Sequence, residues 1–204
     1  MSATGAPESA GQATLTEVSP YAALAAAAAR YPGNEFLLVP APACAAYSDG
    51  PISLTYSQAL AQVERLATNY REAGLGVGHR VALLLENRPE YFLHWFALNA
   101  LGASVVPVNP DSRHAEIAYL LAHSEAILAI CIPERAADLQ AAAAEAGRNK
   151  RVAIPDEVAG GLARIAASAE PCSTSLEAEC ALMYSVVSTV FEKYDLSNAL
   201  SASL

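Results

Sequence analysis

Polar side chains that are able to bind a ligand follow two apolar runs in the middle of the chain. Asn87 comes after the run Arg80 to Leu85, and Asn109 and Asp111 come after the run Ser104 to Val108. If these runs are parallel strands, their carboxyl ends lie at one edge of a sheet, which is where such sheets bind ligands. We therefore take Asn87, Asn109 and Asp111 as the candidate ligand-binding residues.

The same positions have a second interpretation as helix caps. Asn87 lies two residues before Pro89, which suits the first turn of a helix, and Asp111 and Ser112 precede another helical stretch. Short polar side chains at such positions accept hydrogen bonds from the free N–H groups of the first turn. Capping is the favoured interpretation, and ligand binding stays open beside it.

No other pattern in the sequence predicts catalysis or a metal site. The four cysteines and four histidines include no C-x-x-C pair and no H-x-x-x-H spacing, so we expect reduced cysteines and no metal ligands. Gly74, Gly76 and Gly78 precede a strand, whereas a phosphate-binding loop joins a strand to a following helix. These glycines are therefore predicted to form turns and a helix cap.

The aromatic residues and two of the histidines lie on predicted helices and have simple structural interpretations. Phe92, Trp95 and Phe96 share one short stretch, where a core position is the expected role of a large ring. His94 and His123 are expected at exposed or half-buried positions. No serine, histidine and carboxylate arrangement for nucleophilic catalysis is recognisable.

The elements that would hold the candidate residues form a repeating pattern between Arg80 and Ile132. Three apolar runs alternate with two stretches of helical spacing, Pro89 to Leu101 and Arg113 to His123. Such alternation predicts an α/β fold with a mainly parallel sheet and helices on both faces, preceded by a few β elements.

Further elements are predicted on either side of this unit. They are helices at Tyr21 to Arg30 and Pro133 to Ala146, a helix capped by Ser57, strands at Phe36 to Val39, Arg151 to Ile154 and Glu179 to Tyr184, and a hairpin in which Asp49 and Gly50 join Ala46–Tyr47 to Ile52–Thr55.

Composition limits the classes of partner. The chain has 204 residues, of which 53% are hydrophobic and 16% charged, so a large core is expected. The net charge of −9 and the scattered basic residues argue against nucleic acid and anionic membranes. Residues 1–17 have no basic start, and the longest apolar stretch, Tyr91 to Val108, is interrupted by polar residues, glycine and proline. We expect a cytoplasmic protein without a secretory signal or a membrane span.

Three blocks of sequence together resemble the adenylate-forming acyl-CoA synthetase and ligase superfamily. The blocks are LTYSQAL at Leu54 to Leu60, GVGHRVALLLENRPEY at Gly76 to Tyr91, and LNALGASVVPVNP at Leu98 to Pro110. Their order and spacing also agree, and the resemblance covers roughly Leu15 to Tyr184. It implies the N-terminal subdomain of the acyl-adenylate synthetase fold.

The resemblance implies that intact members use ATP, Mg and CoA to convert a carboxylic acid into an acyl-CoA through an acyl-adenylate. In such members a glycine-rich phosphate loop ending in lysine follows a strand like Ala181 to Tyr184. Here the sequence continues Ser185, Val186, Val187, and no glycine occurs after Gly161. A loop that approaches phosphate closely depends on glycine. No catalytic, cofactor-binding or metal-binding residue is therefore transferred to this chain, and no cofactor is expected for it alone.

The expected organisation is a disordered tail at residues 1–18, a truncated N-terminal synthetase domain at 19–184, and a tail outside the family at 185–204. We expect a chain that is inactive alone. The alternatives are a non-catalytic partner, pairing with the missing remainder of a ligase, or a small-molecule binding module. Uncovered strand edges and apolar faces would favour self-association.

Overall fold

A four-stranded parallel sheet forms the centre of the protein. The computed structural model describes residues 19–147, 150–165, 179–187 and 190–195. The strands are β3 (Arg80–Leu84), β4 (Ser104–Pro107), β5 (Leu128–Cys131) and β6 (Arg151–Ala153), in the order β4-β3-β5-β6. All the neighbouring pairs within this sheet are parallel. The predicted α/β class and the three central runs are confirmed.

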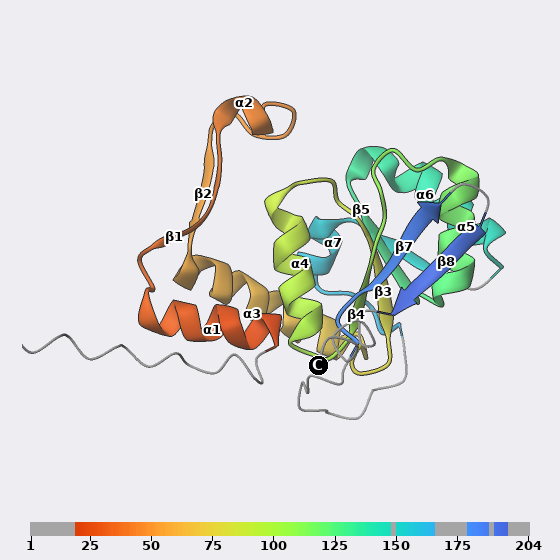
Figure 1. Ribbon diagram of the computed structural model, residues 1–204. Helices are drawn as coiled ribbons and strands as arrows, with labels where there is room; N and C mark the ends of the chain where they lie inside the picture. Colours follow the sequence, from red (N-terminus) through yellow and green to blue (C-terminus); the bar gives the residue numbers. More distant parts are fainter. Residues whose placement is uncertain (1–18, 148–149, 166–178, 188–189, 196–204) are drawn as a thin grey trace, which may run out of the picture.

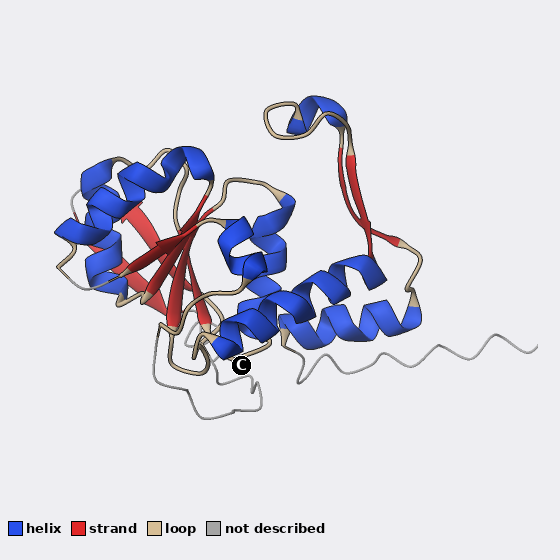
Figure 2. Cartoon of the chain, turned by 180° about the vertical axis from the view of Figure 1, so that it is seen from behind, coloured by secondary structure: helices blue, strands red, loops and turns tan. Residues whose placement is uncertain are grey.

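Helices cover both faces of this sheet (Figure 2). Alternate strand residues enter two separate clusters: Val81 and Leu83 lie with α3 and α4, while Ala82 and Leu84 lie with α5 and α6. This follows from the two-residue repeat of a strand, which sends successive side chains to opposite faces. The helices are α3 (Tyr56–Glu72), α4 (Pro89–Asn99), α5 (His114–Ser124) and α6 (Ala136–Glu145). The 3₁₀ turn η1 (Pro133–Arg135) precedes α6, and α1 (Pro20–Arg30) and α7 (Pro155–Gly160) both lie against α3.

A two-stranded ribbon stands beside the sheet, with a short helix at its tip (Figure 1). It consists of β1 (Glu35–Val39), α2 (Ala41–Cys44) and β2 (Ile52–Thr55), with β1 and β2 antiparallel. The predicted hairpin about Asp49 and Gly50 is therefore wrong. The partner of β2 is β1, which lies earlier in the sequence than Ala46–Tyr47. The residues between the two strands form α2 and the turn that follows it.

Thr55, rather than the predicted Ser57, caps α3. The Thr55 hydroxyl accepts a hydrogen bond from the Gln58 N–H at 3.3 Å, and the Gln58 side-chain oxygen accepts one from the Thr55 N–H at 2.9 Å. This reciprocal pair satisfies two donors at once. A Thr-x-x-Gln spacing was present in the sequence and identifies this cap better than a serine alone.

The amino end of the sheet is joined to the segment that leads into β7 (Leu182–Val187). Arg80 bonds Glu179 twice, Nε to Oε1 at 2.7 Å and Nη2 to Oε2 at 2.9 Å. The side chain of Asn99 and the backbone N–H of Val105 both donate to the Cys180 carbonyl at 3.2 Å. Ala181 then forms a parallel bridge with Val105, and β7 pairs with β8 (Val190–Asp195) in an antiparallel hairpin.

The position of one histidine differs from the expectation, whereas two turn glycines agree with theirs. His94 is only 2% exposed, so its predicted position at or near the surface is wrong. Its Nδ1 lies 2.5 Å from the Tyr70 hydroxyl, and burial lowers the pKa of His94 to about 4. Gly74 and Gly78 have φ angles of 93° and 81°, which confirms their predicted turn roles.

The remaining expectations concern the aromatic residues, the cysteines, a membrane span and the two tails. Trp95 and Phe96 pack against the core as predicted, whereas Phe92 is 38% exposed. Cys44, Cys131 and Cys180 are free thiols, and Cys172 lies outside the described residues. Within the described residues, every helix is too short or too polar to cross a membrane. The predicted tail at 1–18 and most of that at 185–204 lie outside the described residues.

Candidate functional site

The carboxyl ends of β3 and β4 carry two adjoining cavities, which we call the first and second rim cavities. The first has a volume of about 350 Å³ and the second about 300 Å³. Asn109 lines both, Asp111 lines the first, and Asn87 lines the second. The first is lined by Pro107, Asn109, Asp111, Ser112, Glu116, Tyr119, Leu120 and Tyr184. The second is lined by Glu86, Asn87, Tyr91, Pro107, Val108, Asn109, Pro110, Met183 and Tyr184.

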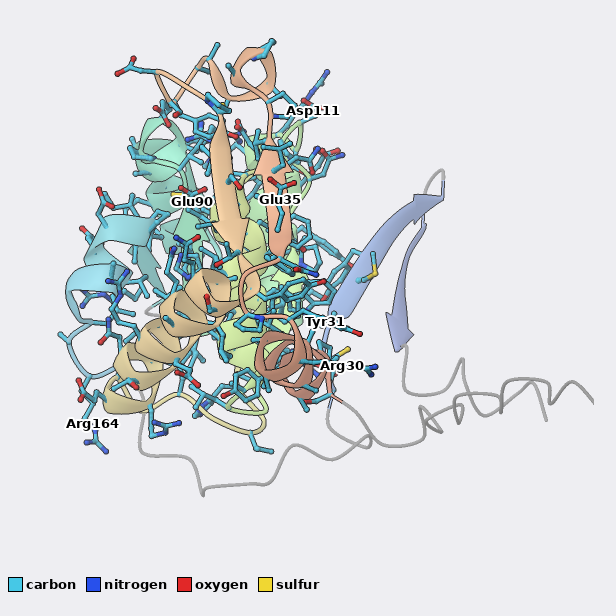
Figure 3. The ribbon with its side chains drawn as sticks, turned by 90° about the vertical axis from the view of Figure 1, so that its left-hand side faces the viewer. Arg30, Tyr31, Glu35, Glu90, Asp111 and Arg164 are labelled. Carbon is cyan, nitrogen blue, oxygen red and sulfur yellow. The ribbon has the colours of Figure 1, made fainter. Side chains whose placement is uncertain are left out.

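The structure thus brings the three candidate residues to one rim, as expected from a parallel sheet. Figure 3 shows Asp111 at the same end of the molecule as the tip of the β1–β2 ribbon, with Arg164 at the opposite end. Asn109 and Asp111 are also connected directly, because the Asn109 side-chain oxygen accepts the Asp111 N–H at 3.0 Å. The three residues share a location, and Asn109 is the residue common to both cavities.

The favoured interpretation of Asn87 and Asp111 as helix caps is wrong. The N-cap residues are Arg88 for α4 and Arg113 for α5. At α5 the backbone N–H of the N-cap residue is bound by a side chain of the same helix: the Glu116 carboxylate accepts the Arg113 N–H at 2.7 Å. Asn87, Asp111 and Ser112 therefore do not occupy capping positions.

An arginine from η1 holds the loop between β4 and α5 in place. The Arg135 guanidinium donates to the carbonyl oxygens of Pro110 at 2.6 Å and Ser112 at 3.1 Å, and to Asp138 at 2.9 Å. The hydrogen bond from Arg135 also lowers the pKa of Asp138. Residues 110–112 are thereby fixed against the start of α6, so the rim has a defined shape without a ligand.

His114 adds a second connection between α5 and α6. Its two ring nitrogens lie 2.8 Å from a Glu145 oxygen and 3.3 Å from an Asp138 oxygen. The hydrogen bond with Glu145, followed by that with Asp138, raises the pKa of His114. Asp138 bonds Arg135 and His114, and Glu145 bonds His114. The negative charges of the two carboxylates are therefore partly neutralised by these contacts, which lie outside the rim cavities.

Two tyrosines form part of the wall of the first rim cavity. Tyr119 on α5 stacks on His123 with ring centres 5.4 Å apart, and Tyr184 on β7 meets the same imidazole edge-on at 5.9 Å. The Tyr184 hydroxyl lies 3.3 Å from His123 Nδ1, and burial raises the pKa of Tyr184. The imidazole therefore holds tyrosines from a helix and a strand beside one cavity.

Glu86, at the edge of the second rim cavity, has an uncommon backbone conformation. Its φ is 56°, in the left-handed region that a residue with a side chain adopts at an energetic disadvantage. Its carboxylate lies 3.2 Å from Arg88 Nε, and the Arg88 guanidinium lies 4.3 Å from the centre of the Tyr47 ring. These contacts connect the rim to the tip of the ribbon.

The sequence did not identify four of these residues as candidate site residues: Glu116, Tyr119, Arg135 and Tyr184. Glu116 and Tyr119 are three residues apart on one helix, and such spacing places two side chains on the same face. That signal was present but is common in helices. The contributions of Arg135 and Tyr184 depend on contacts between distant parts of the sequence, which no local pattern reveals.

The chemistry available at the rim is that of binding rather than of phosphate activation. Glu86, Asp111 and Glu116 line the two cavities, and in the part of the chain that the structure describes no lysine, arginine or histidine lines either one. Over the same residues no group of three potential metal ligands is present. Carboxylates repel phosphate at short distance, so the lining residues do not fit a nucleoside triphosphate.

Comparison with known proteins gives a consistent family. The model of the AMP-binding enzyme family matches residues 24–189. A feruloyl-CoA synthase of Amycolatopsis sp is 39% identical over 150 residues, which are 72% of this chain and 29% of that protein. The chain therefore spans less than a third of the length of that relative.

Solved structures agree with the fold. The N-terminal subdomain of Klebsiella oxytoca NpsA superposes with a TM-score of 0.66 at 20% identity, covering 86% of this chain and 41% of that one. O-succinylbenzoate coenzyme A synthetase (MenE) from Bacillus subtilis, in complex with AMP, gives 0.67 at 19% identity and covers 93% of this chain and 47% of that one.

Proposed function

Because the chain belongs to the AMP-binding enzyme family and corresponds to its N-terminal portion, we propose that it is the scaffold part of an acyl-CoA synthetase or ligase. The whole enzyme would join a carboxylic acid to CoA through an acyl-adenylate, with ATP and Mg. The polypeptide of 204 residues would not catalyse this reaction alone. The feruloyl-CoA synthase relative supports the reaction class, and the cytoplasm is the location we propose.

The observation that carries this proposal is the acidic character of the rim. In an open parallel sheet a nucleotide would approach the carboxyl ends of the strands. There the cavities present Glu86, Asp111 and Glu116, and the sequence has no glycine after Gly161 from which a phosphate loop is built. The chain supplies the sheet and its covering helices, and the groups that bind and activate phosphate would come from elsewhere.

An exchange assay tests the proposal directly. The purified chain is incubated with ATP, Mg, labelled pyrophosphate and a panel of carboxylic acids that includes ferulic acid. We expect no acid-dependent incorporation of label into ATP, because adenylate formation needs the phosphate-binding groups. The Amycolatopsis feruloyl-CoA synthase, assayed in parallel, serves as the positive control.

Acid-dependent exchange by the isolated chain at a rate that scales with its concentration would contradict the proposal. A circular dichroism spectrum recorded on the same sample shows whether the chain is folded. A folded chain without exchange supports the scaffold role.

A non-catalytic binding role is the second candidate function, and the two rim cavities favour it. A chain that pairs with the remainder of a ligase, or with a second copy, would form particles larger than one chain. Light scattering over a concentration series tests self-association: a monomer at high concentration argues against it, and leaves pairing with the remainder of a ligase and small-molecule binding at the rim as the remaining non-catalytic roles.

A further inference from the structure

The first rim cavity has the properties of a site for a small organic cation. We propose that it binds a quaternary ammonium or a protonated amine between α5 and β7, with Tyr119, Tyr184, Asp111 and Glu116 as the contacting residues. This goes beyond the scaffold role, which does not require the cavity to bind anything.

The size and walls of the cavity support an organic ligand rather than a bare ion. Its volume of about 350 Å³ is at the lower end of the range of small-molecule sites, roughly 300–1,000 Å³. Tyr119, one of the two tyrosines of the wall, is 38% exposed. Tyrosine faces attract cations through the negative charge of the ring face, and methylated ammonium groups gain most because they are weakly hydrated.

The charge of the lining selects a cation. Among the described residues that line the cavity, Asp111 and Glu116 are the ionisable groups besides the tyrosines, and both are exposed at the protein surface. Glu116 accepts the Arg113 N–H through one oxygen, which leaves its negative charge in place. A carboxylate next to an aromatic wall discriminates between a cation and an uncharged molecule of the same shape.

Two basic side chains that the structure describes near the cavity have partners of their own. Arg135 already donates to two loop carbonyls and to the Asp138 carboxylate, so its charge is compensated before a ligand arrives. His123 lies against both tyrosines.

The loop that carries Asp111 is held before binding. Arg135 fixes the carbonyls of Pro110 and Ser112, and Asn109 accepts the Asp111 N–H. Groups that are ordered in advance lose little conformational entropy when a ligand binds. The Asp111 carboxylate is therefore available at the mouth of the cavity without a rearrangement of the loop.

The test compares choline with dimethylbutanol, its uncharged isostere in which carbon replaces the ammonium nitrogen. Both are titrated into the full chain at low salt, with binding followed by NMR chemical shifts. We expect saturable binding of choline, at least about tenfold weaker binding of the isostere, and weaker choline binding as salt is added. This comparison needs no variant, so a folding defect cannot obscure it.

Variants then assign the site. Asp111→Asn and Tyr119→Leu should each weaken choline binding by about three- to fivefold. Asp49→Asn, which removes an equal charge from an exposed position in the ribbon, should leave it unchanged. Choline binding that equals isostere binding, that is absent at millimolar concentration, or that changes equally in Asp49→Asn would overturn the proposal. None of these readings depends on adenylate formation, so the scaffold role is judged separately by the exchange assay.

Discussion

The two ends of the parallel sheet differ in how their polar groups are used. At the amino end, Arg80 and Glu179 bond each other twice, and the Asn99 side chain bonds the backbone of Cys180. At the carboxyl end, Asn109 and Asp111 line open cavities instead. Groups that bond one another inside the protein stabilise the fold, whereas groups that face a cavity remain available for a ligand.

The difference follows from the way the chain connects its strands. At the carboxyl end, β3 and β4 each continue into a loop with polar residues before the next helix, at residues 85–88 and 108–113. At the amino end the returns are tight, with Gly78 and Gly102 at φ angles of 81° and 69°. A methyl group on Gly102 would lie 2.6 Å from Val77 Cγ2, so this return tolerates no side chain without movement. The amino end is therefore structural, and variation in sequence is more easily accepted at the rim.

Acidification gives the largest expected loss of stability, and it acts at the structural, amino-end side of the sheet. His94 contacts Tyr70 on α3, the helix that leads into the amino end of the sheet. The pKa of His94 is lowered to about 4 from an ordinary value of 6.5. Between these values the unfolded chain binds a proton that the folded chain excludes. The stability is complete above the higher pKa and falls by about 3 kcal/mol as the pH approaches the lower one.

Urea denaturation across this pH range measures the effect. The His94→Gln variant should lose less stability on acidification than the unaltered chain, because it has no proton to exclude. Identical curves for His94→Gln and the unaltered chain would show that this histidine does not govern the acid response.

The ion pair at the amino end gives the next largest effect. Arg80→Met leaves the Glu179 carboxylate without its guanidinium partner, and the two side chains are only 21% and 25% exposed. We expect a loss of about 1–2 kcal/mol in the free energy of unfolding. Arg65→Met, at an exposed site on α3, is the control and should change it by less than about 0.5 kcal/mol. Equal effects of the two substitutions would remove the distinction between the two ends.

The rim should show the smallest effect on stability. Asp111→Asn and Asn87→Ala alter exposed side chains that line cavities and cap no helix. Each should change the free energy of unfolding by less than about 0.5 kcal/mol, measured by urea denaturation at neutral pH. A loss above about 1 kcal/mol would mean that the rim supports the fold in the same way as the amino end.

The central fold was predictable because its signals are local. The runs at Arg80 and Ser104 are long enough and apolar enough to be recognised as strands buried on both faces. The errors arose where a local signal competed with a distant contact. Asp49 and Gly50 form a good turn dipeptide, yet β2 pairs with β1, and His94 is polar, yet it is buried against Tyr70.

The three candidate residues were predicted to share one edge of the sheet, and the structure places them there, whereas most other residues that line the two cavities were not predicted. Asn109 and Asp111 were found because polar residues after buried strands are a general feature of parallel sheets. The favoured capping role of Asp111 was wrong, since α5 has its N-cap at Arg113, whose N–H is accepted by Glu116, and ligand binding by Asn109 and Asp111 stays a prediction. Tyr184 contacts His123 from 61 positions away in the sequence, and a pairing over that separation carries no periodic signal.

The order of the strands also determines when the sheet is completed. The first of its strands to leave the ribosome, β3, lies between β4 and β5, so its backbone groups on the two sides are satisfied by two later segments. Each segment arrives only after a whole helix has crossed the sheet, and contacts between such separated segments form slowly. Until β4 arrives, β3 presents two unpaired edges, and one of them stays unpaired until β5 arrives. The nascent chain is thus vulnerable to wrong pairing at β3 until Cys131 has been added.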